Sequence, residues 1–213
     1  MRILAIGPHP DDVEFGCGGT LARHSAMGDK VYIVHMSRGY HYVVAKHLLV
    51  RTEVEGMQEA KRAGLVLTGQ EPTILDYPPQ YMKCEEDVIS ALDGLIRTLK
   101  IDTVYTVWEN DTNQDHREIH HASLAACRNV PDVLCYETPR FMKITMMPFR
   151  PQKYVDITSY WDKKLKAMQQ YEKIVAYYGE EFLKQVETRA YFRGLECGAT
   201  MAEAFEIVRE VIR

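Results

Sequence analysis

The sequence predicts an α/β fold, a Rossmann-like, doubly wound three-layer structure in which helices flank a mostly parallel sheet. Two observations predict it. Short runs of β-branched and aromatic residues alternate with segments whose apolar residues recur at helical spacing. Such alternation is typical of right-handed βαβ units, which build parallel sheets. The chain has 213 residues and no internal repeat or linker-like tract, so we expect a single domain over residues 1–213.

Strands are predicted where a short apolar run carries β-branched or aromatic side chains. KVYIVHM is the clearest of these runs, and TIL is the weakest. In chain order, the predicted strands cover residues 2–6, 30–36, 73–75, 102–107, 133–136 and 154–157.

Helices are predicted where apolar residues recur at intervals of three and four. Val88, Leu92 and Ile96, for example, share one helix face. The predicted helices cover residues 21–27, 47–63, 86–99, 116–128, 159–178 and 201–212. In a doubly wound sheet the ligand binds outside the carboxyl ends of the strands. Loops that follow two different strands are therefore expected to share one cleft.

The composition argues against several classes of function. A formal net charge of −4 at pH 7 gives no support to a nucleic-acid or anionic-membrane surface. The apolar runs are too short for a transmembrane helix, and the N-terminus lacks the pattern of a signal peptide. Five cysteines without CxxC spacing predict free thiols in a reducing compartment. We therefore expect a soluble cytoplasmic protein that binds neither nucleic acid nor membrane.

The loop after the first predicted strand, GPHPDDVEFGCGGT, carries His9, Asp11, Asp12 and Glu14. Imidazole and carboxylate groups are suitable ligands for zinc, and borderline ligands for manganese, iron or cobalt. Adjacent aspartates at a helix start diverge by about 100°, so Asp11 and Asp12 can hold different roles. The alternative is that these acids only stabilise the N-terminus of the following helix, which is where Glu14 fits best.

The loop after the fourth predicted strand, WENDTNQDHREIHHA, carries a second group of ionisable side chains: Asp111, Asp115, His116, His120 and His121. Taken alone, it is also typical of a capped helix with surface histidines. His116 and His120 are four residues apart, so both can face one ion if the segment is helical. A catalytic metal needs three protein ligands and an open position. His9, Asp12 and one histidine of this loop supply that set.

Together, the two loops resemble the signatures of a known family. HPDDVEFGCGGTLA resembles the first signature of the LmbE/PIG-L-type metal-dependent N-deacetylases, and NQDHREIHHA resembles their second, H-x-D-H. Similar stretches follow: SRG, RTEVEGMQEAKRAG with its spacing shifted by about one residue, KYVDITSYWDKKLKAMQQY and RGLECGATMAEAF. The resemblance covers nearly the whole chain, and the motifs are jointly specific.

The resemblance implies which residues form the site. The metal ligands fall on His9, Asp12 and His116, with Zn²⁺ or another divalent transition metal as the cofactor. The general base falls on Asp11, and the acidic residue of the second motif falls on Asp115.

Two positions match the family less directly. Arg51 corresponds to an arginine that contacts substrate, with shifted spacing. Asn113 stands where the family usually has a histidine that helps to stabilise the oxyanion; asparagine donates a neutral hydrogen bond but carries no charge. Losing such a group costs a factor of about 100–1,000 in turnover when nothing replaces it. Either His120 or His121 compensates, or the metal does more of the work, or the activity is altered.

The implied activity is zinc-dependent removal of an N-acetyl group from an N-acetylglucosamine-type amino sugar or conjugate. The metal would polarise the acetyl carbonyl and lower the pKa of water towards about 7. Asp11 would accept the proton and return it to the leaving amine. Two alternatives stay open: another amide or acyl substrate on the same metal site, or a catalytically altered metal- or sugar-binding protein. The resemblance leaves a homo-oligomer open beside a monomer.

Several other side chains carry expectations. The candidate aromatic residues for the rim of a sugar site are Tyr40, His41, Tyr42, Tyr77 and Tyr81, although ordinary half-buried tyrosines are an equally good interpretation. We expect Tyr171, Ile174, Val175 and Tyr178 to belong to the core. Glu203 is expected to be exposed on the last helix.

Overall fold

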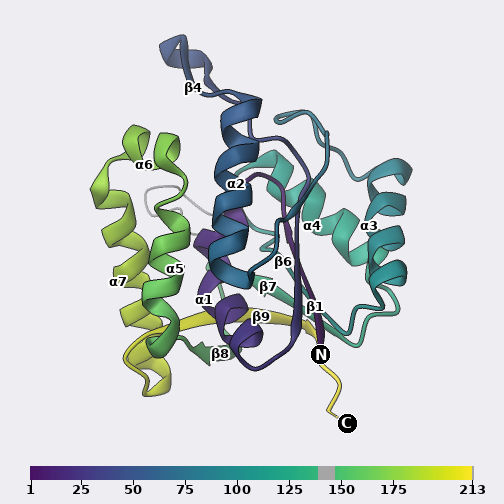
Figure 1. Ribbon diagram of the computed structural model, residues 1–213. Coiled ribbons are helices and arrows are strands. Elements are labelled where there is room, and N and C mark those ends of the chain that lie inside the picture. Colours follow the sequence, from purple (N-terminus) through teal and green to yellow (C-terminus); the bar gives the residue numbers. More distant parts are fainter. Residues whose placement is uncertain (139–146, 213) are drawn as a thin grey trace.

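A seven-stranded sheet forms the middle layer of the computed structural model, which describes residues 1–138 and 147–212 (Figure 1). In spatial order its strands are β5 (Thr73–Ile74), β2 (Lys30–His35), β1 (Arg2–Gly7), β6 (Thr103–Val107), β7 (Asp132–Tyr136), β9 (Ala202–Arg209) and β8 (Lys153–Asp156). The first five strands pair in parallel. Strand β9 runs antiparallel to both of its neighbours. The mostly parallel sheet predicted from the sequence is confirmed.

Helices cover both sides of this sheet (Figure 1). The helices α3 (Glu86–Leu99) and α4 (Gln114–Ala126) lie on one side. The opposite side carries α1 (Asp12–Ala26), α2 (Glu53–Thr68), α5 (Trp161–Met168), α6 (Glu172–Tyr178) and α7 (Glu180–Cys197). Side chains along β1 alternate between two apolar clusters: Ile3 and Ala5 pack in one, and Leu4 and Ile6 in the other. This alternation confirms the three-layer arrangement.

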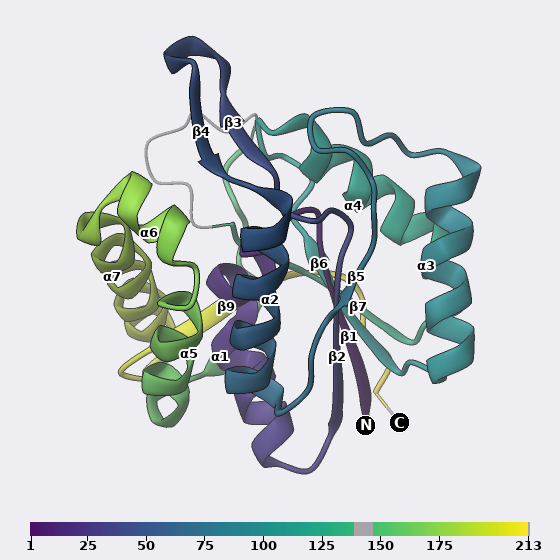
Figure 2. The same cartoon turned by 45° about the horizontal axis from the view of Figure 1, so that its top comes forward.

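A β-hairpin projects beyond one end of the sheet (Figure 2). It consists of β3 (His41–Val43) and β4 (Leu48–Arg51), joined by a 3-10 turn at Val44–Lys46. The helix predicted over residues 47–63 is therefore wrong in its first part. Thr52 begins α2 with a capping box, in which its hydroxyl accepts from Glu55 N–H and the Glu55 carboxylate accepts from Thr52 N–H. This capping box sets where α2 begins.

The last third of the chain contains the largest errors of the sequence-based prediction. The helix expected over residues 159–178 is a 3-10 turn (Thr158–Tyr160) followed by α5 and α6. These two helices are separated at Tyr171, whose φ and ψ of −84° and 59° are not helical. Helix α7 was not predicted. The expected C-terminal helix is strand β9, because β7 and β8 provide hydrogen-bond partners on both of its edges.

Glu203 lies on β9 and is only 5% exposed, so its expected place on an exposed helix is wrong. Its carboxylate accepts hydrogen bonds from the backbone N–H groups of Gly19 at 2.9 Å and Thr20 at 2.7 Å. Lys164 Nζ lies 2.6 Å from Glu203 Oε1. Helix α1 has a non-helical residue at Cys17, with φ −134°. Glu203 therefore caps the second half of α1 and joins that helix to the sheet.

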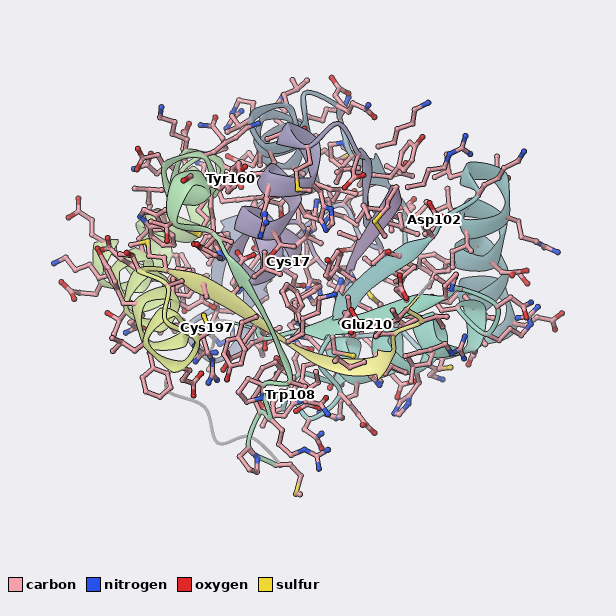
Figure 3. The ribbon with its side chains drawn as sticks, turned by 90° about the horizontal axis from the view of Figure 1, so that it is seen from below. Cys17, Asp102, Trp108, Tyr160, Cys197 and Glu210 are labelled. Carbon is pink, nitrogen blue, oxygen red and sulfur yellow. The ribbon has the colours of Figure 1, made fainter. Side chains whose placement is uncertain are left out.

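All five cysteines are free, as predicted. Cys17 is buried within α1, whereas Cys197 is exposed at the end of α7 (Figure 3). Among the helices that the structure describes, none has both the length and the apolar character needed to cross a membrane.

Candidate metal centre and active site

Two loops meet where the parallel strands β1 and β6 lie side by side. Strand β1 pairs with β2 on one side and with β6 on the other, so the order of the strands reverses here. The loop after β1 supplies His9 and Asp12, and the segment after β6 supplies His116. One potential ligand atom from each lies within 4.8 Å of the other two. The structure thus brings together the three expected ligands at the switch point of a doubly wound sheet.

Asp12 lies between two imidazole rings. Its Oδ2 is 3.2 Å from His9 Nδ1, and its Oδ1 is 3.3 Å from His116 Nε2. The two rings are 5.5 Å apart between centroids. Burial opposes ionisation of Asp12, yet its contacts with His116 and His9 hold its pKa well below the usual range. Asp12 is therefore a carboxylate, the form that binds a metal.

Each imidazole also has a second carboxylate on its far side. His9 Nε2 lies 2.8 Å from Asp115 Oδ2, and His116 Nδ1 lies 2.9 Å from Asp111 Oδ2. A neutral imidazole has one N–H, so it can donate to only one of two flanking carboxylates. A cation beside Asp12 would resolve this conflict, because both rings could then donate outward. Metal-binding histidines are commonly oriented in this way. Two imidazoles and one carboxylate fit zinc and related divalent metals.

His9 holds a proton firmly when only protein groups surround it. Burial acts to lower the pKa of His9, but the hydrogen bonds and charges of Asp115 and Asp12 raise it from 6.5 to about 9. A proton and a metal therefore compete for the ring nitrogen that faces Asp12.

Asp11 has a strained backbone at the N-terminal boundary of α1, with φ 120° and ψ −34°. Its side chain lines the cleft above the metal ligands. Burial raises the pKa of Asp11 to about 6 against the opposing charge of Arg51, and the neighbouring Asp12 adds to the rise. A carboxyl group with a pKa in this range is suited to proton transfer near neutral pH.

Arg51 is almost fully buried, and its guanidinium contacts protein acceptors. Nε donates to Gly39 O at 2.7 Å, and Nη2 donates to Pro10 O at 3.1 Å. Nη1 lies 3.3 Å from a Glu59 oxygen and 3.4 Å from Asp11 Oδ2. Arg51 therefore holds the Asp11 loop against α2 and the segment before the hairpin. It also lines the cleft, and the substrate contact expected of it stays a prediction.

Asn113 is the N-cap of α4, and its Oδ1 accepts from the backbone N–H of Asp115 at 2.9 Å. This bond fixes the amide and leaves its NH₂ group as the donor at the edge of the cleft, which Asn113 lines. The cleft-lining residues that the structure describes include neither His120 nor His121. His120 instead contacts Val107 O through Nδ1 at 2.9 Å. The structure thus gives no support to compensation for Asn113 by these histidines.

Two buried groups that support the site were not anticipated. Asp111, named in the second loop without a role, holds His116 and also accepts from the Thr138 hydroxyl at 2.8 Å. Glu14 is in the first turn of α1, as expected, but it is fully buried with Oε1 3.3 Å from His35 Nε2. Thr138 and His35 are both distant in sequence from the carboxylates that they contact, so spacing alone could not reveal these two pairs.

The site opens into a cleft of about 570 Å³. Its wall away from the metal ligands is formed partly by apolar and aromatic side chains: Phe15, Tyr40, His41, Ile174, Tyr178 and Phe182. Tyr40 and His41 were expected at the rim, whereas Tyr42, Tyr77 and Tyr81 do not appear among the described lining residues.

Of the residues assigned to the core, Tyr171 is fully buried, which confirms that expectation. Ile174 is 4% exposed and belongs to the same core cluster, although it also lines the cleft. Val175 is only partly buried, and Tyr178 is 51% exposed and lines the cleft, so its assignment to the core is wrong. Phe182 was missed because α7 was not predicted. The aromatic contacts between Tyr178 and Phe182, at 5.1 Å, and between Phe182 and Phe15, at 5.0 Å, make this wall continuous.

Known proteins resemble this chain in sequence and fold to different degrees. Residues 4–127 match the family described as PIG-L: GlcNAc-PI de-N-acetylase. The uncharacterized deacetylase YaiS of Escherichia coli strain K12 is 34% identical over 181 residues, which cover 80% of this chain and 90% of YaiS. The N,N'-diacetylchitobiose deacetylase from Pyrococcus horikoshii superposes with a TM-score of 0.81 at 22% identity, covering 97% of this chain and 83% of that one.

A protein with a different activity shares the same fold. GalB, the 4-carboxy-2-hydroxymuconate hydratase from Pseudomonas putida KT2440, superposes with a TM-score of 0.84 at 22% identity, over 100% of this chain and 98% of that one. The fold alone therefore does not distinguish deacetylation from hydration. The family match spans more than half of the 213 residues and includes both loops of the site. The chain belongs to the PIG-L (LmbE-like) family of GlcNAc deacetylases and is a hydrolase of the N-deacetylase class.

Proposed function

We propose that the protein removes the N-acetyl group of an N-acetylglucosamine-type amino sugar or its conjugate, with zinc or a related divalent metal in the site. One observation carries this proposal: two imidazoles converge on the carboxylate of Asp12 while each has a carboxylate behind it. His9, Asp12 and His116 would hold the metal. When bound, it would act as a Lewis acid that polarises the acyl carbonyl and makes water more acidic.

Asp11 is the residue placed to move the proton. As a carboxylate it accepts a proton from the attacking water, and as the acid it returns that proton to the nitrogen of the leaving amine when the C–N bond breaks. Its raised pKa of about 6 makes both steps accessible near neutral pH. The ion pair with Arg51, at 3.4 Å, keeps the carboxylate oriented towards the cleft.

Asn113 and Asp115 support the reaction in different ways. The NH₂ group of Asn113 is a neutral donor for the carbonyl oxygen as negative charge develops on it. Asp115 accepts from His9 Nε2 at 2.8 Å and from the backbone N–H of Gln80 at 2.7 Å. Asp115 is therefore a positioning residue, which orients the metal-facing nitrogen of His9.

The cleft supports an amino sugar as the substrate class. Its volume of about 570 Å³ admits a molecule larger than a single acetyl group. The wall that contains Tyr178 and Phe182 offers flat apolar surface to the C–H face of a sugar ring. Among the structures with this fold, one acts on N,N'-diacetylchitobiose and another functions in teicoplanin biosynthesis, so sugar-containing amides are the natural set to test.

A hydratase activity is the second candidate, since a hydratase shares the fold. Asn113 favours keeping it under test, because a neutral donor in place of a histidine changes how the site stabilises an oxyanion. Another amide or acyl substrate on the same site, or a protein that only binds metal or sugar, are the remaining alternatives.

The test is release of acetate by the zinc-loaded protein from N-acetylglucosamine, N,N'-diacetylchitobiose and N-acetylglucosamine conjugates. We expect release that a chelator abolishes and zinc restores. Stoichiometric zinc without acetate from any of these compounds would favour the binding-protein alternative. Water addition to an unsaturated tricarboxylate, without acetate release, would favour the hydratase.

A further inference from the structure

A second group of metal-ligating side chains lies outside the cleft. Glu109 follows β6, and His120 and His121 lie on α4. One potential ligand atom from each of the three lies within 4.8 Å of the other two. The described lining of the cleft includes none of them. This group is therefore distinct from the site that contains His9 and Asp12.

His120 is already held in the orientation that a metal ligand needs. His120 is 4% exposed, and its Nδ1 lies 2.9 Å from the backbone oxygen of Val107, to which it can only donate. The lone pair is therefore on Nε2. Metal-binding histidines commonly donate their other ring N–H to a backbone carbonyl in this way.

His121 and Glu109 complete a set of donors that the protein does not otherwise use. Adjacent side chains on a helix diverge by about 100°, yet the rings of His120 and His121 approach to 5.4 Å between centroids. Within residues 1–138 and 147–212, neither the His121 ring nor the Glu109 carboxylate has a hydrogen-bond or ion-pair partner. One carboxylate and two imidazoles therefore lie close together without a hydrogen bond or an ion pair between them.

We propose that Glu109, His120 and His121 form a second binding site for a divalent transition metal of the zinc class. Two nitrogen donors and one carboxylate oxygen are a donor set that zinc prefers. Magnesium and calcium prefer sites built from oxygen alone. Glu109 and His121 are exposed at the surface, so a fourth position is open to water. This site goes beyond the proposed deacetylase activity and does not depend on it.

The position of the site gives it a structural consequence. Glu109 belongs to the segment between β6 and α4, which also carries Asp111, the residue behind His116. The preceding residue, Trp108 (labelled in Figure 3), is buried and packs edge-on against Phe149, with the ring centroids 5.5 Å apart. A metal bound by Glu109, His120 and His121 would tie the segment between β6 and α4 to helix α4. We expect occupancy to stabilise the fold.

Zinc stoichiometry tests the proposal directly. Untagged protein, dialysed against micromolar zinc and then analysed for metal, is expected to hold about two zinc ions per chain. The variants His121→Ala and Glu109→Gln are each expected to hold about one and to keep wild-type acetate release. His9→Ala is expected to lose the other ion, and His9→Ala with His121→Ala to lose both. His47→Ala, which removes an exposed histidine of the hairpin, is the matched control and is expected to bind as the wild type does.

A second readout uses the His9→Ala background, in which only the proposed site remains. Zinc is expected to raise the melting temperature of this variant, and adding Glu109→Gln is expected to abolish the rise. The proposal is overturned if the wild type holds one ion that His9→Ala removes, or if His121→Ala holds as much zinc as the wild type. Loss of acetate release in the wild type would count against the proposed function and leave this stoichiometry unaffected.

Discussion

Replacing Asp111 with asparagine tests whether the carboxylate behind His116 controls the metal centre. Asp111 is buried, its Oδ2 lies 2.9 Å from His116 Nδ1, and the same oxygen accepts from the Thr138 hydroxyl at 2.8 Å. Its Oδ1 accepts from the backbone N–H of Asn113 at 2.8 Å. Both oxygens are thus acceptors, and asparagine keeps only one of them.

The expected effect follows from the tautomer of His116. If the NH₂ group of the new asparagine faces the ring, Nδ1 has to accept, and the ring proton moves to Nε2. That nitrogen, 3.3 Å from Asp12 Oδ1, then has no lone pair for a metal. Losing a partner of this kind typically weakens metal affinity by about 10–100-fold, which corresponds to about 1.4–2.7 kcal/mol.

The measurement is zinc affinity by competition with a chromophoric chelator, on protein shown by circular dichroism to be folded. Asp162→Asn, on the exposed surface of α5, is the matched control and should bind zinc like the wild type. Thr138→Val removes only the hydroxyl and should have a smaller effect than Asp111→Asn. A folded Asp111→Asn variant with wild-type zinc affinity would refute this account of His116.

Asp11→Asn is expected to bind zinc normally but to lower kcat for acetate release by about 100–10,000-fold; normal turnover would contradict its role as base. In the wild type, kcat/KM should rise with pH as Asp11 loses its proton. This rise is expected at or below pH 6, because burial raises the pKa of Asp11 to about 6 and a bound cation lowers it. A kcat/KM that falls with pH through this range would count against the assignment of Asp11 as the base. In metal-free protein the pKa of His9 is raised from 6.5 to about 9, so its stabilising contribution is full below pH 6.5 and disappears as pH rises through 9. Zinc binding near pH 7.5 should therefore release about one proton. Calorimetry in buffers of different ionisation enthalpy measures this release. A binding heat that does not depend on the buffer would contradict the release of a proton from His9. Lys164→Met leaves the buried Glu203 carboxylate without its cation and should lower the free energy of unfolding by about 3–5 kcal/mol in denaturant melts, whereas adding Glu203→Gln should recover part of the loss; no recovery would argue against the ion pair as the cause.

The fold class and the meeting of the two loops were predictable because both depend on local patterns. Alternating strand and helix periods predict parallel neighbours, and parallel neighbours place the loops after β1 and β6 at one edge of the sheet. The three-residue spacing of His9 and Asp12 is likewise a local property of the chain. Strand β9 was missed for the opposite reason. Strand β9 is a strand because β7 and β8 pair with it, and no local period reports a partner in a distant part of the sequence.

By itself, the sequence determined the α/β class, the two loops and the residues available to bind a metal. Only the tertiary structure decided which neighbour each of those residues has. It places Asp111 behind His116, turns His120 towards Val107 O and away from the cleft, and brings Glu203 to the middle of α1. Periodicity reports which side of an element is buried, whereas the partner of a buried polar group is set by packing between distant segments.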